Sequence, residues 1–241
     1  MKDRGDVTDL TVFVGRFGSG KTETAINYAL WLVQDLELRA AEPGTNPETG
    51  GPVILIDLDI VTPYFRSREM AERVEQHGVE VIAPSVVGQH LDTPAITPQI
   101  LGAIQQTERP VVIDVGGDRQ GARALGQFSP AVRQRGYTMH FVVNPYRPFT
   151  DTLAGLTSSI SEIEASARLR MTSLVSNPNL IGETTAQQIL EGHAKIERFA
   201  RALKLPIAFV CLERRWISEL GVHPFAEPVL VLDRHFVMSW E

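Results

Sequence analysis

Residues 15–22 of this chain read Gly-Arg-Phe-Gly-Ser-Gly-Lys-Thr, which matches the phosphate-loop pattern G-x-x-x-x-G-K-[ST] at every fixed position. The glycines allow successive backbone N–H groups to point inward at an anion, along a path that a Cβ at Gly18 or Gly20 would obstruct. Lys21 supplies a positive charge for the β- and γ-phosphates, and the Thr22 hydroxyl is an oxygen ligand suited to Mg²⁺. The stretch therefore predicts binding of a nucleoside triphosphate with magnesium.

The residues on either side of this stretch have the patterns that a phosphate loop requires. Leu10–Val14 is rich in strand formers, and apolar residues recur with a helical period from Thr22 to Leu38. A strand, a loop and a helix in this order bring the helix N-terminus under the phosphates, where its dipole and free N–H groups favour an anion. The alternative is a glycine turn before a core helix. We expect the nucleotide to contact Gly15, Arg16, Phe17, Gly18, Ser19, Gly20, Lys21, Thr22 and Glu23.

Along the rest of the chain, short apolar runs alternate with helical patterns, which predicts repeated strand–helix units. Several of the runs are continuously apolar, as is typical of strands covered on both faces. We therefore predict an α/β fold, a doubly wound and mostly parallel sheet of seven to eight strands, in a single nucleotide-binding domain over residues 1–241 with a mobile loop at 41–51. Strands are expected at 10–14, 52–58, 79–83, 110–115, 138–143, 171–176, 206–212 and 228–232, and helices at 22–38, 65–77, 97–106, 121–135, 149–168 and 184–204.

Acidic residues lie at two of the strand ends where ligands of such sheets bind. Asp57 and Asp59 end the second strand, and the fourth runs into Asp114-Val115-Gly116-Gly117-Asp118. A carboxylate at this position can hold magnesium or orient the attacking water. Turn caps are the alternative for any single aspartate. Because two such clusters accompany a phosphate loop, we favour a functional role for these aspartates over turn capping. We expect magnesium to be held by Thr22, Asp57 and Asp114.

The order of these motifs resembles the MinD/ParA group of nucleotide-dependent switch ATPases, which includes the CobQ/CobB-type domains. The resemblance covers most of the chain and is concentrated at 10–25, 53–59, 110–118 and 173–180. It implies that Asp59 positions the hydrolytic water, that Asp114 is the magnesium-binding aspartate, that Gly117 donates a backbone N–H, and that Asn177 lies against the purine base. For Asn177, an Asn-Pro turn is an equal alternative.

The chain departs from this group at two places in and after the phosphate loop. Arg16 replaces the group's lysine and Phe17 the glycine that follows it, while Ile60-Val61 replaces Pro-Gln after the second aspartate. The group's lysine reaches across a dimer interface, and an arginine can bind phosphate oxygens through two N–H groups. We therefore predict an ATP-dependent homodimer in which Arg16 acts in trans during catalysis. The alternative is that Arg16 stays within its own subunit. The change after Asp59 implies slow or partner-dependent hydrolysis.

Composition narrows the class of protein further. The formal net charge of −6 gives no reason to expect nucleic-acid binding, and the charged start without any long apolar stretch predicts a cytoplasmic protein without membrane contact. Cys211 is the one cysteine, and the six histidines show no paired ligand spacing, so we assign no histidine to a metal.

Together these features predict a Mg²⁺-dependent ATPase, binding ATP and ADP, that acts as a switch on an unidentified protein partner. The alternative is a small-molecule kinase or ligase of the CobB/dethiobiotin-synthetase type. A metallochaperone is disfavoured because a cysteine pair is absent from the sequence. DNA partitioning or membrane positioning is disfavoured by the negative charge and by a C-terminal end, residues 236–241, that lacks a basic amphipathic helix.

Overall fold

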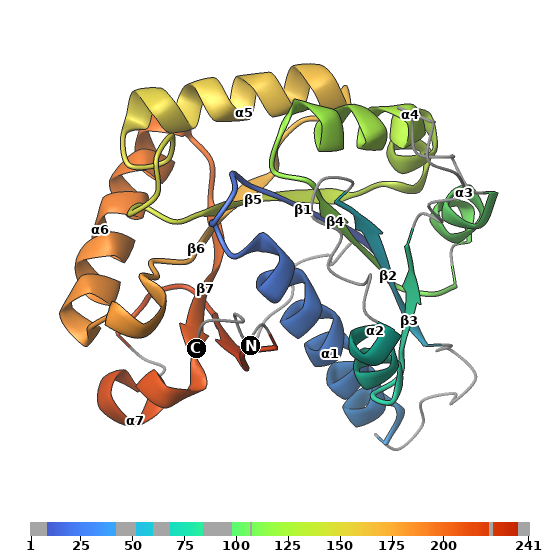
Figure 1. The fold of residues 1–241 in the computed structure, drawn as a ribbon, viewed down its shortest axis with the longest axis horizontal. Coiled ribbons are helices and arrows are strands. Elements are labelled where there is room, and N and C mark those ends of the chain that lie inside the picture. The colour runs from blue at the N-terminus through green and yellow to red at the C-terminus, as the bar shows by residue number, and fades with distance from the viewer. Residues whose placement is uncertain are drawn as a thin grey trace.

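The structure is a computed structural model, and it describes residues 9–41, 52–59, 68–83, 98–106, 108–221 and 224–235. These residues form an eight-stranded parallel sheet with helices on both faces (Figure 1). The strands are β1 (Leu10–Val14), β2 (Val53–Leu58), β3 (Val79–Ile82), β4 (Val111–Val115), β5 (Thr138–Val143), β6 (Ser173–Ser176), β7 (Ile207–Glu213) and β8 (Val229–Leu232). The helices are α1 (Lys21–Ala40), α2 (Arg68–Glu75), α3 (Pro98–Gln105), α4 (Arg119–Arg135), α5 (Leu153–Ala167), α6 (Ala186–Leu203) and α7 (Ile217–Leu220).

The order of strands across the sheet places the phosphate loop at its centre. The order is β3-β2-β4-β1-β5-β6-β7-β8, so β1 has β4 on one side and β5 on the other. The chain runs from β1 to β2 and β3 on one side of the sheet, returns to place β4 between β2 and β1, and then continues on the other side through β5 to β8. Crevices beyond the carboxyl ends of the strands form where this direction changes. The segment after β1 therefore lies in the crevice.

Two apolar layers cover the sheet. One contains side chains of α3, α4, α5 and α6, and the other contains side chains of α1 and α2. In Figure 1, α4 and α5 lie above the sheet and α1 lies below it. Every residue of β1, β2 and β4 is buried, which explains the continuously apolar runs in the sequence. The fold class predicted from the sequence is confirmed, with eight strands that are all parallel.

Helix caps account for the main differences in predicted boundaries. The side chain of Asp118 accepts a hydrogen bond from the Gly121 backbone N–H at 2.8 Å, so α4 begins at Arg119, two residues earlier than predicted. Thr152 caps α5 in the same way, so this helix begins at Leu153 rather than at residue 149. The short α7 was not predicted. Residues 42–51 of the predicted loop and residues 65–67 of the predicted second helix lie outside the described residues.

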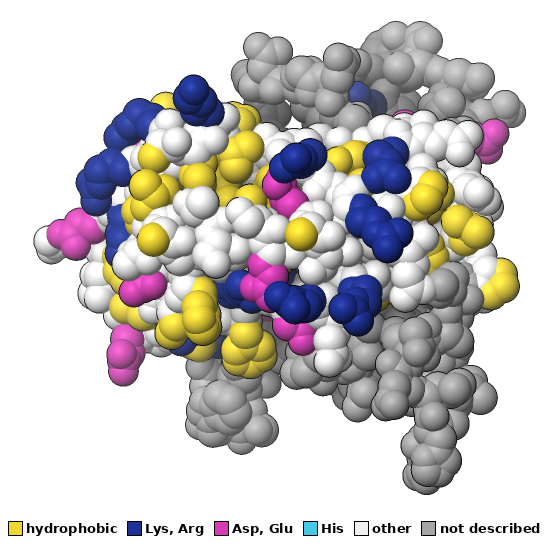
Figure 2. Space-filling view, turned by 90° about the horizontal axis from the view of Figure 1, so that it is seen from above, with side chains coloured by type: hydrophobic (Ala, Val, Ile, Leu, Met, Phe, Trp, Pro, Cys, Tyr) yellow, Lys and Arg dark blue, Asp and Glu magenta, His cyan; other side chains and the backbone are white. Residues whose placement is uncertain are grey.

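The molecular surface over α4 and α5 is mixed in character. Figure 2 shows this side from above, with Lys and Arg side chains interspersed among acidic, polar and scattered hydrophobic ones. No helix in the described ranges is long and apolar enough to cross a membrane.

One histidine is buried in the apolar layer below the sheet. His140 on β5 lies against the aromatic rings of Phe13 and Phe209, with ring centroids 5.2 and 5.7 Å away. Its Nδ1 is 2.6 Å from the Ser173 hydroxyl oxygen. Burial lowers the pKa of His140 from 6.5 to about 4, because a charged imidazole would lose its hydration there.

This burial predicts acid sensitivity of the fold. The unfolded chain takes up the His140 proton near pH 6.5, whereas the folded chain does so only near pH 4. Since the unfolded state then binds more protons, the free energy of unfolding should fall as the pH is lowered through this window, by about 3 kcal/mol in total. We expect His140→Gln to reduce the slope of stability against pH between 6.5 and 4, measured by urea unfolding at several pH values. An unchanged slope would contradict a neutral buried imidazole.

Candidate functional site

The segment between β1 and α1 has the backbone of an anion-binding loop. Gly18 and Gly20 have φ angles of 76° and 82°, which lie in the left-handed region that favours glycine. A Cβ at Gly20 would also lie 2.2 Å from the Asn177 side-chain nitrogen. No side chain caps the start of α1 at Gly20, so the first N–H groups of the helix are available to an anion.

Lys21 and three aspartates meet beside this loop. Lys21 Nζ forms an ion pair with Asp59 Oδ2 at 3.1 Å, and both side chains are buried. Asp57 and Asp114 are register partners on the adjacent strands β2 and β4, and the Asp59 backbone N–H donates to Asp57 Oδ1 at 2.9 Å. The sheet thus brings together the acidic residues that were predicted as functional from the two strand ends.

Thr22 and Asp114 form the part of the site that suits a cation. The Thr22 hydroxyl donates to Asp114 Oδ2 at 2.7 Å, while the buried Asp114 Oδ1 has no hydrogen-bond partner among the described residues. A buried carboxylate oxygen without a partner is costly unless an ion or water satisfies it. These hard oxygen donors fit Mg²⁺. Asp57 is buried close by, with one oxygen engaged by the Asp59 backbone.

The charged side chains in this cluster shift one another's pKa values. Burial acts to lower the pKa of Lys21, but attraction to Asp114, Asp59 and Asp57 outweighs burial, so the pKa of Lys21 is raised. Burial raises the pKa of Asp114, against the opposing effects of Lys21 and of the Thr22 hydrogen bond. The cluster therefore holds Lys21 as a cation among carboxylates.

The ends of the neighbouring strands hold the phosphate loop from both sides. A Cβ at Gly117, after β4, would lie 2.8 Å from the Gly15 carbonyl oxygen and 2.9 Å from the Phe17 nitrogen, so only glycine permits this close approach. From the β6 side, the Asn177 side-chain N–H donates to the Ser19 carbonyl at 2.7 Å. The amide predicted to contact a purine base is thus bonded to the phosphate loop. The role of Asn177 toward a base stays a prediction.

Asn144 is a site residue that the sequence analysis missed. It follows β5, is buried, and donates to the Asn179 carbonyl at 2.7 Å while accepting from the Tyr146 backbone N–H at 3.1 Å. It thereby ties the end of β5 to the segment after β6. The signal in the sequence that could have identified Asn144 was its position at a strand end, directly before Pro145.

The remaining predicted site residues lie at the rim of the loop. Arg16 donates to the Ser159 hydroxyl at 2.9 Å and forms an ion pair with Glu162, both on α5 of the same chain. Phe17 is 82% exposed. The Glu23 carboxylate accepts the backbone N–H of His235 at 2.9 Å.

No protein-family description and no curated protein sequence matches the chain. Solved structures of similar fold include the signal recognition particle receptor FtsY from Elizabethkingia anophelis in complex with GDP, with 13% identity and a TM-score of 0.47. Chloroplast FtsY from Physcomitrella patens has 15% identity and a TM-score of 0.49, and cell division protein FtsY from Thermotoga maritima has 16% and 0.48. The parallel sheet, with a phosphate loop between β1 and α1, gives the chain a P-loop NTPase-like α/β fold.

The matches cover 84–87% of this chain but only 59–61% of the FtsY chains. At 13–16% identity, the similarity between this chain and the FtsY structures concerns the fold alone.

The resemblance to the MinD/ParA group is corrected by this comparison, because the similar structures named above are FtsY proteins. The assignment of the chain to that group is wrong. The residues that carried it, a phosphate loop and acidic strand ends, are features that a P-loop sheet needs in general for phosphate and magnesium. Arg16 and Phe17, which depart from the group's pattern, were the sequence signals against the assignment.

The geometry of the loop predicts separable roles for Lys21 and Thr22. Lys21→Ala removes the cation at the phosphates and should weaken nucleotide binding by at least about 100-fold, the scale of a buried charge-assisted contact. Thr22→Ala leaves that cation in place and should mainly reduce the dependence of binding on Mg²⁺. Calorimetric titration with and without magnesium measures both effects. Unchanged affinity in folded Lys21→Ala protein would refute a nucleotide site at this loop.

Proposed function

We propose that this chain is a Mg²⁺-dependent ATPase whose nucleotide state controls a protein partner. The observation that carries the proposal is the ion pair between Lys21, in the phosphate loop, and Asp59, which directly follows β2. In the proposal the lysine binds phosphate oxygens and the aspartate orients the attacking water. Thr22 and Asp114 would hold the magnesium, which would neutralise the phosphate charge.

The Lys21–Asp59 pair supports a switch because Lys21 has two competing partners. When phosphate oxygens reach the loop, they compete with Asp59 for the Lys21 ammonium group. A buried carboxylate without its cation is energetically costly. Asp59 must therefore accept a hydrogen bond from another donor, such as the attacking water. The end of β2 would then differ between the free and the nucleotide-bound states, which is the change that a partner can detect.

The choice of ATP over GTP rests on the side chains beyond β6 and β7. Guanine presents two adjacent N–H donors to a free carboxylate, whereas an amide can both accept from and donate to adenine. Glu213 is the carboxylate at the end of β7, but its oxygens already bind Asn179 at 2.9 Å and Arg215 at 2.7 Å. The amide nitrogens of Asn177 and Asn179 are also engaged, by the Ser19 carbonyl and by Glu213. The Asn177 amide oxygen would therefore be the acceptor for the adenine amino group, and the proposal of ATP rests on this oxygen.

Turnover with each nucleotide tests the proposal. Phosphate release is expected with ATP and Mg²⁺, at a low rate, and more weakly with GTP. A preference for GTP would refute the base assignment while leaving the site intact. Transfer of the γ-phosphoryl group to a small molecule, seen as a phosphorylated product, would instead support the kinase or ligase alternative.

Asp59→Asn should separate binding from hydrolysis. The substitution removes the carboxylate that competes for Lys21, so ATP affinity should stay the same or increase. It also removes the group proposed to orient water, so single-turnover hydrolysis should slow by roughly 100-fold or more. Asp118→Asn is the matched control, because this aspartate caps α4 instead. Wild-type hydrolysis in Asp59→Asn would contradict the proposed role.

An ATP-dependent homodimer with Arg16 acting in trans is the second part of the proposal. Phe17 and Phe149 are 82% and 65% exposed, and the Arg16 guanidinium lies 5.5 Å from the centre of the Phe149 ring. Exposed aromatic rings beside an arginine are the residue types enriched at protein interfaces. Arg16 now pairs with Glu162, so acting on a partner's phosphate requires that this pair open.

Light scattering of the hydrolysis-deficient Asp59→Ala protein tests the dimer. ATP should raise its mass to that of a dimer, and adding Arg16→Ala should abolish this effect without abolishing ATP binding. Arg119→Ala is the matched control, since Arg119 also lies near Glu162, at 3.4 Å, but outside the phosphate loop. A protein that stays monomeric with ATP at high concentration would contradict the trans role.

A further inference from the structure

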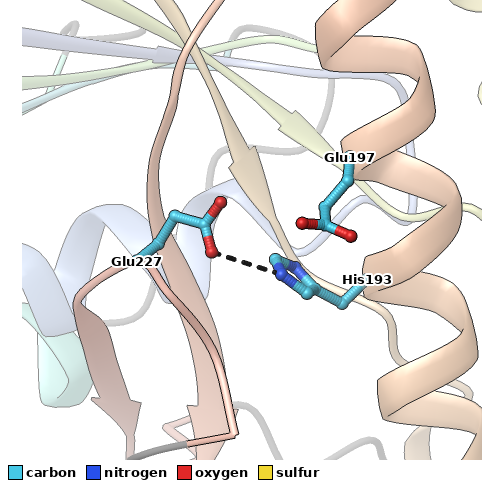
Figure 3. A group of neighbouring side chains, drawn as sticks. All are labelled: His193, Glu197 and Glu227. Atoms are coloured by element: carbon cyan, nitrogen blue, oxygen red, sulfur yellow. Dashed lines mark ion pairs between the residues drawn. The ribbon is translucent and has the colours of Figure 1, made fainter.

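Three side chains that bind metals elsewhere in proteins converge between α6 and the start of β8. His193 and Glu197 lie one turn apart on α6, and Glu227 lies two residues before β8 (Figure 3). One ligand atom from each of the three side chains lies within 4.8 Å of the other two. Residues four apart share one face of a helix, so this convergence follows from the helix and from the chain's return to the sheet.

The His193 ring is held in one orientation. Its Nδ1 lies 3.0 Å from the Ser176 hydroxyl oxygen at the end of β6, and its ring packs against Phe225 with centroids 4.8 Å apart. The other nitrogen, Nε2, faces Glu227 Oε2 at 3.3 Å. Metal-binding histidines are oriented in this way, with one ring nitrogen bonded to the protein and the other directed at the ion.

The two carboxylates lack the partners that their positions require. Glu227 Oε2 is buried and makes no hydrogen bond to any described residue, since its contact with His193 is an ion pair by distance only. No hydrogen bond or ion pair joins Glu197 to another side chain within the described part of the chain, although it faces the same point. A buried oxygen without a partner beside a second carboxylate is costly, and a cation removes that cost.

A surface depression adjoins the two carboxylates of this cluster. It has a volume of about 360 Å³, and Glu197 and Glu227 line it together with Arg201, Lys204 and the start of β7, whereas His193 lies outside its lining. An ion can therefore reach the two glutamates from solvent.

We propose that His193, Glu197 and Glu227 bind a divalent transition metal ion, with Zn²⁺ as the best fit. One imidazole and two carboxylates with an open fourth position is a donor set that Zn²⁺ accepts, and Mg²⁺ disfavours the nitrogen. Ligands of tetrahedral Zn²⁺ lie about 3.3–3.6 Å apart, given metal–ligand bonds of about 2.0–2.2 Å. The His193–Glu227 distance of 3.3 Å already matches this spacing, and Glu197, whose ligand atom lies within 4.8 Å of both, has to approach by at most about 1.5 Å. This site is separate from the phosphate loop and does not rest on the proposed ATPase function.

Metal analysis of untagged full-length protein tests the site. After treatment with a chelator and dialysis against Zn²⁺, one zinc per chain is expected by mass spectrometry, with a higher melting temperature than for the metal-free protein. Co²⁺ should give weak visible absorption without a thiolate band. The Lys21→Ala variant should bind zinc as the wild type does, which separates this result from any failure of the nucleotide site.

Glu197→Gln distinguishes a metal site from a simple His193–Glu227 ion pair. Glu197 is only partly buried, so the variant keeps the fold, and it leaves that pair intact. If the cluster binds metal, Glu197→Gln should weaken zinc affinity by at least about 10-fold, and Glu227→Gln should do the same. Glu191→Gln is the matched control on the same helix, because its carboxylate accepts from Gln187 instead. Absence of stoichiometric zinc, or equal affinity in Glu197→Gln and Glu191→Gln, would overturn the proposal.

Discussion

The buried charge of Lys21 is the constraint on which the site depends. An ammonium group taken out of water needs compensation, and here Asp59 binds it directly while Asp114 and Asp57 add attraction. These carboxylates come from different strands, so the compensation exists only if β2 and β4 lie side by side with their carboxyl ends level. The observed register, which pairs Asp57 with Asp114, meets this condition. The phosphate loop is therefore completed by the sheet and is not a local feature of residues 15–22.

The strand order explains how one loop is held from two sides. Because β1 lies between β4 and β5, the segments that follow those strands, and β6 beyond, all end near the loop. Gly117 approaches it from the β4 side, and Asn177 from the β6 side. A loop held this way can keep its N–H groups directed inward before any anion arrives, which lowers the cost of ordering on binding.

Residues 10–25 show how much of this could be predicted from sequence. Local patterns sufficed for the strand, the glycine-rich loop and the helix, because backbone freedom and apolar period are properties of neighbouring residues. The carboxylates at strand ends were also predictable, since parallel strands end at one edge. The pairing of Arg16 with Glu162 and the position of Asn144 were not, because each depends on which strands and helices become neighbours. The family assignment failed for a related reason: short motifs record chemistry that many P-loop sheets share.

His193 also shows what could not be predicted from the sequence, in this case a site that the sequence analysis left unassigned. Counting histidine pairs left it unassigned, whereas a glutamate four residues later on the same helix was a signal that pairs of histidines do not capture. The third member, Glu227, is distant in sequence and meets the others only because β8 lies next to β7. Ser176, which orients His193, is followed directly by Asn177, which holds the phosphate loop. Successive side chains at a strand end point to opposite sides, so the end of β6 supports both clusters with consecutive residues. A displacement of this strand end would therefore move the supports of both clusters together.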